Sequence, residues 1–159
     1  MSNIRRLMIL GLALVMALAL AAPAFAQGTP EAQVRVAHLA SDAPNVDVYA
    51  NDQPVAPLQN VPYGTVSPYL PLPTGTQNVK VYPAGDTSSP VIEADVPLES
   101  GRAYTIGAVG LVGDGSITGH VYQDDLTPPA QGNSKLRVIH ASPDAGPVDV
   151  VPVGGAPLV

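Results

Sequence analysis

The 159-residue sequence predicts an all-β fold, an immunoglobulin-like antiparallel β-sandwich of about seven strands. Two observations support this class. From Val34 onward, apolar residues alternate with polar ones or form short runs rich in Val, Ile, Tyr and Thr, as half-buried strands do. Pro and Gly interrupt these runs about every eight to twelve residues, which is typical of sandwiches and barrels, and no segment keeps a helical period.

Each candidate strand is a short run of this composition. The seven runs are residues 34–38, 46–50, 64–70, 78–82, 91–96, 103–111 and 117–123. The region 61–72 contains Pro62, Pro68 and Pro71, and Pro73 follows it. Because proline cannot donate to a sheet ladder, this region is expected to supply an edge strand at best. Asp114-Gly115 lies between the last two runs and predicts that they form a hairpin.

A repeated segment predicts the domain organisation. Residues 34–49 return as residues 136–151, displaced by 102 positions (140 − 38), and eight of the first fifteen aligned pairs are identical. A repeat at a fixed period marks a structural unit that is used more than once. We expect four parts after the N-terminal segment: a flexible lead (27–33), a first β-sandwich module (34–126), a linker (127–134) and the first two strands of a second, truncated copy (135–159).

The short second copy leaves two interpretations open. Two strands alone are marginally stable in water because they bury too little surface. Either the sequence is a fragment of a longer protein, or residues 135–159 pair with the first module or with another chain, as in β-augmentation. The second interpretation predicts oligomers that are lost when the chain is cut at Gly132.

The N-terminal segment has the features of a cleaved signal peptide over residues 1–26. Arg5 and Arg6 precede an apolar run at 7–22, and Ala24-Phe25-Ala26 forms a small-residue cleavage site. The run of 16 residues (22 − 7 + 1) is shorter than the ~20 residues that span a bilayer. We therefore expect a secreted or extracytoplasmic protein, in the periplasm or at the cell surface, without membrane insertion after cleavage.

The charge and the absence of cysteine restrict the expected partners and the means of stabilisation. The net charge of −6 becomes −8 when Arg5 and Arg6 are removed (−6 − 2). Such an acidic chain repels phosphate backbones, so nucleic acid is not an expected partner. With no cysteine, no disulfide compensates for a small core.

The residues that the two copies share are interpreted as structural. The repeat places His38, Asp42 and Asp47 opposite His140, Asp144 and Asp149. Alternation puts each His at the end of an apolar row, where we expect it to bond a turn backbone or the Asp four residues later. The first Asp of each copy is expected in a turn, and the second, flanked by Val, is expected to point outward.

A catalytic interpretation of the same residues is the alternative. A hydrolase or metal-dependent enzyme would use His38 with Asp42 or Asp47, but no serine occupies the same place in both copies. Asp114, Asp124 and Asp125 offer too few carboxylates for a typical calcium loop. His120 is expected in solvent, and the six tyrosines are expected to pack in the core and at its rim, although a carbohydrate-binding platform of tyrosines is the competing interpretation. The sequence thus predicts no catalytic, metal-binding or cofactor-binding residue.

Four stretches of the sequence resemble a known family. They are residues 137–145 with 148–150, residues 35–44 with 46–49, residues 61–69 and residues 101–105. Together they are similar to the bacterial domain-of-unknown-function family numbered 4397, and the resemblance covers essentially all of 34–159. Leu39-Ala40-Ser41 stands where the family has Ala-Ser-Pro.

The resemblance implies an exported β-sandwich module, often in tandem, found in bacterial envelope or secreted proteins. It implies no activity and no catalytic residue. The expected function is a noncatalytic structural, adhesion or recognition role, with an unknown envelope or extracellular protein or glycan as the partner.

Overall fold

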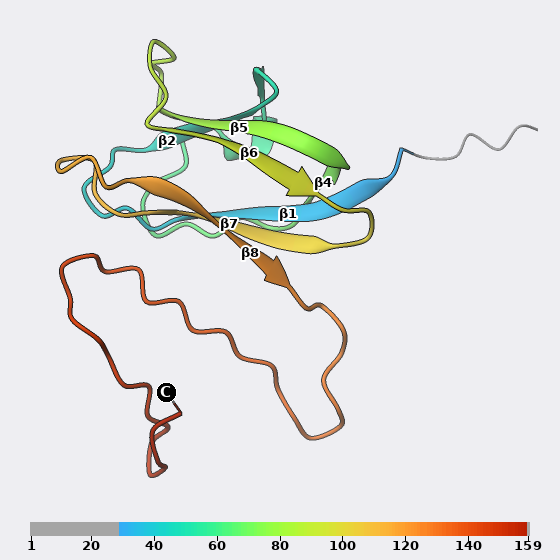
Figure 1. Cartoon of the computed structure of the whole chain (residues 1–159), viewed down its shortest axis with the longest axis vertical. Helices are drawn as coiled ribbons and strands as arrows, with labels where there is room; N and C mark the ends of the chain where they lie inside the picture. The colour runs from blue at the N-terminus through green and yellow to red at the C-terminus, as the bar shows by residue number, and fades with distance from the viewer. Residues whose placement is uncertain (1–28, 159) are drawn as a thin grey trace, which may run out of the picture.

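Two stacked sheets followed by an extended segment make up the computed structural model, which describes residues 29–158 (Figure 1). The predicted all-β sandwich is confirmed, whereas the finer immunoglobulin-like assignment stays a prediction. The predicted signal peptide, residues 1–26, lies outside the described residues. Within the described part of the chain, no helix has the length and apolar character needed to span a bilayer.

The first sheet has the strand order β4-β1-β7-β8. Its strands are β1 (Glu31–His38), β4 (Leu70–Pro73), β7 (Ala103–Val109) and β8 (Thr118–Asp124). β1 pairs antiparallel with β4 but parallel with β7, so this sheet is mixed rather than purely antiparallel. β1 also begins at Glu31, inside the segment predicted as a flexible lead, because residues 31–33 pair with β4.

The second sheet has the strand order β3-β2-β5-β6. Its strands are β2 (Val46–Ala50), β3 (Gln53–Pro54), β5 (Gly75–Pro83) and β6 (Ile92–Leu98), and a short 3₁₀ helix, η1 (Ala56–Leu58), follows β3. The β2–β3 hairpin was not predicted. Asn51 and Asp52 form its turn with φ values of 49° and 61°, which is the backbone pattern of a type I′ turn.

Two predicted strand boundaries are corrected by the structure. Residues 64–69 form no strand apart from an isolated bridge at Val66, and β4 begins only at Leu70, because prolines interrupt ladder donation there. β7 ends at Val109 because Gly110 has a φ of 88°, and a Cβ on it would lie 2.5 Å from the Ser116 carbonyl oxygen. The β7–β8 hairpin that Asp114-Gly115 predicted is confirmed, with residues 110–117 as its loop.

Valine side chains dominate the core between the two sheets. Val34, Val46 and Val96 are 3 %, 2 % and 1 % exposed, and each buried side chain of this size contributes about 1.5–3 kcal/mol. Tyr104 is the buried tyrosine, and the other five lie at the surface or half-buried. The core therefore relies on aliphatic residues more than the tyrosine content of the sequence suggested.

The four edge strands differ in their proline content. β4 carries Pro71 and Pro73, β3 carries Pro54, and β6 carries Pro97. Proline lacks the N–H group that a further strand would need, so these edges are poor templates for pairing. β8, the outer strand of the first sheet, contains no proline.

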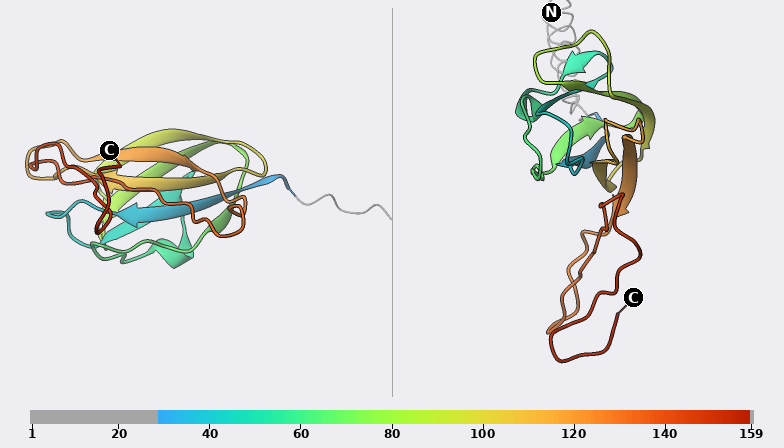
Figure 2. Two further views of the ribbon diagram at one scale, coloured as in Figure 1. Left: turned by 90° about the horizontal axis from the view of Figure 1, so that it is seen from below. Right: turned by 90° about the vertical axis from the view of Figure 1, so that its left-hand side faces the viewer.

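Residues 125–158 contain no strand and extend away from the sandwich as an open hook (Figures 1 and 2). The side chains of Leu136 and Val138 are 77 % and 54 % exposed, although their counterparts in the first copy, Val34 and Val36, are buried. The same apolar positions of the repeat are thus buried in the core in the first copy and exposed to solvent in the second.

Candidate functional site

His38 lies at the end of β1 and is fully enclosed, with 0 % exposure. Its Nε2 lies 3.0 Å from the carbonyl oxygen of Pro44, in the turn that follows the strand. A carbonyl only accepts, so Nε2 carries the proton and the ring is held in one tautomer. Nδ1 is buried and has no hydrogen-bond partner among residues 29–158. Tyr63 packs edge-on against the ring at a centroid distance of 6.1 Å.

His140 makes the same contact in the second copy. Its Nε2 lies 3.3 Å from the Gly146 carbonyl oxygen, six residues later in the chain, just as Pro44 is six residues after His38. Both copies also place a turn over the preceding residues, 41–43 and 143–145. The local backbone conformation therefore recurs, but His140 is exposed whereas His38 is buried.

Asp42 binds a distant loop rather than the adjacent histidine. Its two carboxylate oxygens accept the backbone N–H groups of Val112 and Gly113 at 2.9 and 2.8 Å. These hydrogen bonds lower the pKa of Asp42 below its ordinary value of 3.8. The residue thus joins the turn after β1 to the loop between β7 and β8.

Asp47 is buried, which corrects the expectation that it points into solvent. Its side chain alternates away from the core as predicted, but two loops cover it, and the residue is only 9 % exposed. The carboxylate accepts the backbone N–H of Asn60 at 2.6 Å and that of Gly85 at 2.9 Å. Its counterpart Asp149, like Asp144, is exposed.

The structure does not bring His38 together with Asp42 or Asp47 as a catalytic pair. The ring bonds a carbonyl group, and each carboxylate bonds backbone N–H groups of other loops. Within residues 29–158, no three His, Asp or Glu side chains gather closely enough to hold one metal ion. His120 is exposed on β8, where its ring packs against Tyr122.

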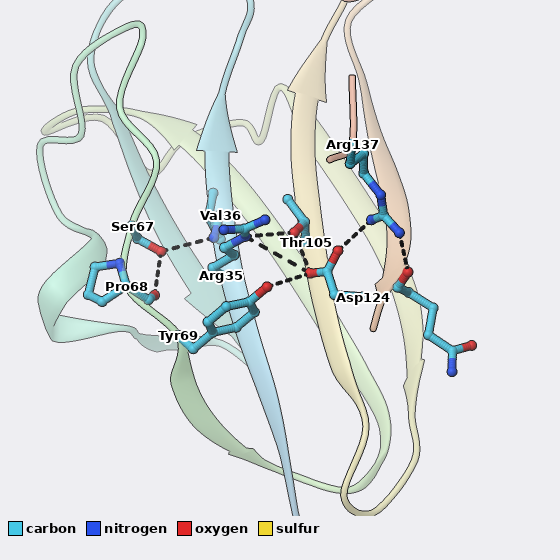
Figure 3. A network of polar contacts seen from close by, with 9 residues as sticks. Arg35, Val36, Ser67, Pro68, Tyr69, Thr105, Asp124 and Arg137 are labelled. Carbon is cyan, nitrogen blue, oxygen red and sulfur yellow. Dashed lines mark hydrogen bonds and ion pairs between the residues drawn. The ribbon is translucent and has the colours of Figure 1, made fainter. Parts of the chain in front are cut away.

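A polar cluster centred on Asp124, at the end of β8, was not predicted from the sequence (Figure 3). The Asp124 side chain is only 7 % exposed. It accepts hydrogen bonds from the Tyr69 hydroxyl at 2.8 Å and the Thr105 hydroxyl at 2.5 Å. Burial, followed by the hydrogen bond and charge of Asp124, raises the pKa of Tyr69 above its ordinary value.

Two arginines approach this carboxylate, one from each copy of the repeat. Arg35 on β1 places its Nε 3.9 Å from Asp124 and donates a hydrogen bond to Thr105 at 2.8 Å. Arg137 donates to the other oxygen of Asp124 and, at 2.6 Å, to the carbonyl oxygen of Gln123. Both guanidinium groups lie over a tyrosine ring, that of Tyr69 for Arg35 at 4.8 Å and that of Tyr122 for Arg137 at 5.7 Å.

Two open clefts flank Asp124, with volumes of about 590 and 480 Å³. Four of the five basic residues outside the predicted signal peptide line one cleft or the other: Arg35, Arg102, Lys135 and Arg137. In an acidic chain, this end of the sandwich therefore holds most of the positive charge. The one sequence signal for the cluster was that Arg35 and Arg137 are an identical pair in the repeat.

Comparison with known proteins identifies a family for the chain. No curated protein matches the chain. The family model described as "Domain of unknown function (DUF4397)" matches residues 32–151. That range includes the sandwich from the second residue of β1 onward, the Asp124 cluster and the opening of the second copy. The match extends over well more than half of the sequence, and the chain therefore belongs to the DUF4397 family.

Proposed function

We propose that the protein is an exported, noncatalytic β-sandwich module with a structural, adhesion or recognition role at the cell envelope or outside the cell. The observation that carries the proposal is the use of His38, Asp42 and Asp47. Each of these polar side chains bonds backbone groups that connect strands and loops of the sandwich. A structural role accounts for all three residues.

The geometry around His38 favours this role over hydrolysis. A general base must reach a nucleophile or water with an unprotonated nitrogen, and a carboxylate must orient the ring. In His38, Nε2 donates to Pro44, and Nδ1 is enclosed. Ser41 and Ser67, the nearest serines in sequence and across the sheet, make no hydrogen bond to the ring within the described residues.

An activity screen with a matched variant tests the noncatalytic part of the proposal. His38→Gln keeps an N–H donor for the Pro44 carbonyl and removes the imidazole. We expect the protein and this variant to hydrolyse chromogenic esters, glycosides and phosphate esters no faster than buffer, with or without divalent cations. Turnover by the protein that disappears in a folded His38→Gln variant would overturn the proposal.

Export is supported by the features of residues 1–26 and needs its own test. Residues 1–33 fused to a reporter that is active only after export are expected to direct it out of the cytoplasm, and N-terminal sequencing of the product is expected to begin at Gln27. Ala24→Leu with Ala26→Leu is expected to block cleavage, because the cleavage site requires small residues. A reporter that stays inactive with the unaltered segment would contradict export.

A further inference from the structure

Of the four edge strands that residues 29–158 form, β8 alone contains no proline, and its neighbours determine the direction of its backbone groups (Figure 1). The carbonyl oxygen of Ala108 on β7 accepts the N–H of Leu39, so the backbone groups of Ala108 point toward β1 and away from β8. Ala108 is paired with Gly119. Because N–H and C=O of one residue point to the same side and successive residues alternate, Gly119, Val121 and Gln123 direct these groups to the free edge.

The contact of Arg137 agrees with this orientation and leaves most of the edge open. Its guanidinium group donates to the carbonyl oxygen of Gln123 at 2.6 Å. Within the described residues, no other hydrogen bond reaches the outward groups of Gly119, Val121 or Gln123. The Val121 residue is also 40 % exposed. The edge of β8 therefore offers backbone donors, backbone acceptors and an apolar side chain to a further strand.

This edge is complementary to itself. Two identical strands related by a two-fold axis run antiparallel. With the axis at Val121, that residue lies opposite its own counterpart, and Gly119 lies opposite Gln123 of the second chain. Each outward residue of β8 then faces another outward residue, and each such pair exchanges two hydrogen bonds.

The side chains of β8 fit the same register. His120 lies opposite Tyr122 of the second chain, in the closer type of antiparallel pair, where cross-strand aromatic contacts favour pairing. Within one chain these two rings are already in contact, at a centroid distance of 4.6 Å. Pairing thus extends this contact into a row of four rings across two strands. On the other face of the sheet, the two Val121 side chains cover each other.

The charges of β8 are complementary in this register. Asp124 is the one acidic residue of the strand, and it lies opposite Thr118 of the second chain. The two Asp124 residues are six positions apart along the paired strands (124 − 118), or about 20 Å, which exceeds the Debye length of about 10 Å. His120 of the second chain, the basic side chain of β8, is the diagonal neighbour of Asp124. Like charges therefore do not face each other on the paired strands.

We propose that β8 is the interface of a two-fold dimer of this chain, with Val121 on the axis and the two first sheets joined into one continuous sheet. Two strands of seven residues bury little surface, and interfaces of small area are weak. We therefore expect a dissociation constant on the order of 0.1 mM. Arg137 competes with the dimer, because it occupies the Gln123 carbonyl that Gly119 of the second chain needs.

The absence of cysteine from the sequence makes the register directly measurable. Val121→Cys places two thiols on the axis, in a pair whose Cα atoms are about 5.5 Å apart, a separation that a disulfide spans. Thr118→Cys is the control on the same strand, because its two thiols would be about 20 Å apart. Under mild oxidation of the purified chain, we expect Val121→Cys to form disulfide-linked dimer roughly tenfold more than Thr118→Cys does. Equal crosslinking of the two variants would overturn the proposal.

Analytical ultracentrifugation measures the affinity without engineered thiols. Val121→Lys brings two like charges together on the axis and is expected to weaken the dimer roughly tenfold. Val121→Thr keeps a β-branched side chain and is expected to leave the dissociation constant within about twofold. Arg137→Ala removes the competitor for the Gln123 carbonyl and is expected to strengthen the dimer about two- to fivefold.

Three results of these measurements would overturn the proposal. One is a purified chain that stays monomeric up to about 1 mM, well above the expected dissociation constant. Another is a dimer that a folded Val121→Lys variant does not weaken. The third is a dimer that Arg137→Ala weakens, because the interface would then include the segment after β8. The crosslinking comparison and the sedimentation of the unaltered chain do not require the lysine variant, so they test the proposal even if that variant fails to fold.

Discussion

Arg35 and Arg137 occupy equivalent positions in the two copies of the repeat and bind the same carboxylate, Asp124. Arg35 does so from within the first sheet, and Arg137 from the segment that follows it. Each guanidinium group is also stacked on a tyrosine. The carboxylate thus links an internal contact of the sandwich to the segment that follows β8.

This relationship predicts unequal effects of the two arginines on stability. Arg35→Ala removes the cation and the Thr105 hydrogen bond from the buried side of Asp124, so we expect it to lower the free energy of unfolding by about 1–3 kcal/mol. Arg137→Ala affects only the contact of the segment after β8 and is expected to lower the free energy of unfolding by less than about 1 kcal/mol. Urea denaturation followed by tyrosine fluorescence measures both. A larger loss for Arg137→Ala than for Arg35→Ala would contradict the assignment of Arg35 as the partner of Asp124 that stabilises the sheet.

The two histidines of the repeat allow the same comparison, between a buried residue and its exposed counterpart. His38→Ala leaves a cavity and an unpaired Pro44 carbonyl in a fully enclosed site, and we expect a loss of about 2–4 kcal/mol. His140→Ala removes an exposed ring that makes the equivalent hydrogen bond, and the expected change is within about 0.5 kcal/mol. The denaturation midpoints of the two variants, compared at one pH, test the difference. Similar midpoints would show that the buried His38 contributes no more to stability than the exposed His140.

Asp47 is expected to be a major contributor to stability among the surface-directed carboxylates. Asp47→Ala leaves the N–H groups of Asn60 and Gly85 without an acceptor beneath two loops, so the expected loss is about 2–4 kcal/mol. Asp149→Ala, its counterpart in the second copy, is exposed and serves as the control with an expected change within about 0.5 kcal/mol. Hydrogen exchange at Asn60 and Gly85 is expected to accelerate in the first variant only. Unchanged exchange there would rule out the bridging role.

The hydrogen bonds of Asp42 predict that part of the loss of folding stability in acid depends on this residue. Its pKa in the folded chain lies below the ordinary 3.8, because the Val112 and Gly113 amides bond the charged form. A depressed pKa contributes stability that is present above the unfolded value and is lost as the pH falls through the folded value. Between about pH 5 and pH 3, the protein is therefore expected to lose more stability than Asp42→Asn does. Parallel pH profiles of the two proteins would contradict this assignment.

The local features of the fold were predictable from the sequence, and the long-range ones were not. β2 was predicted with both of its boundaries because Val46, Val48 and the flanking turn residues define it within one short stretch. β3 was missed because Gln53 and Pro54 carry no apolar alternation, although the Asn51-Asp52 turn before them is a hairpin signal. The boundary of β4 depends on its pairing with β1, which lies about forty residues earlier in the chain.

The same distinction holds for the polar residues. Alternation predicted the direction of the Asp47 side chain but could not predict that the loops at Asn60 and Gly85 cover it. The Asp124 cluster draws its side chains from three strands and two loops, with sequence separations of 55 for Tyr69 and 19 for Thr105. By contrast, the His38 contact with Pro44 and the His140 contact with Gly146 each join residues six apart, which is short enough in sequence for the turn itself to suggest them.

The unequal distribution of proline makes the edges of the sandwich differ from one another. Three of its edge strands contain proline and therefore lack at least one backbone N–H donor. The fourth, β8, contains no proline and continues directly into the predicted linker. Edge-to-edge pairing of the sandwich with another strand is therefore disfavoured on three flanks, and protection from lateral aggregation at the fourth, β8, has to come from features other than proline.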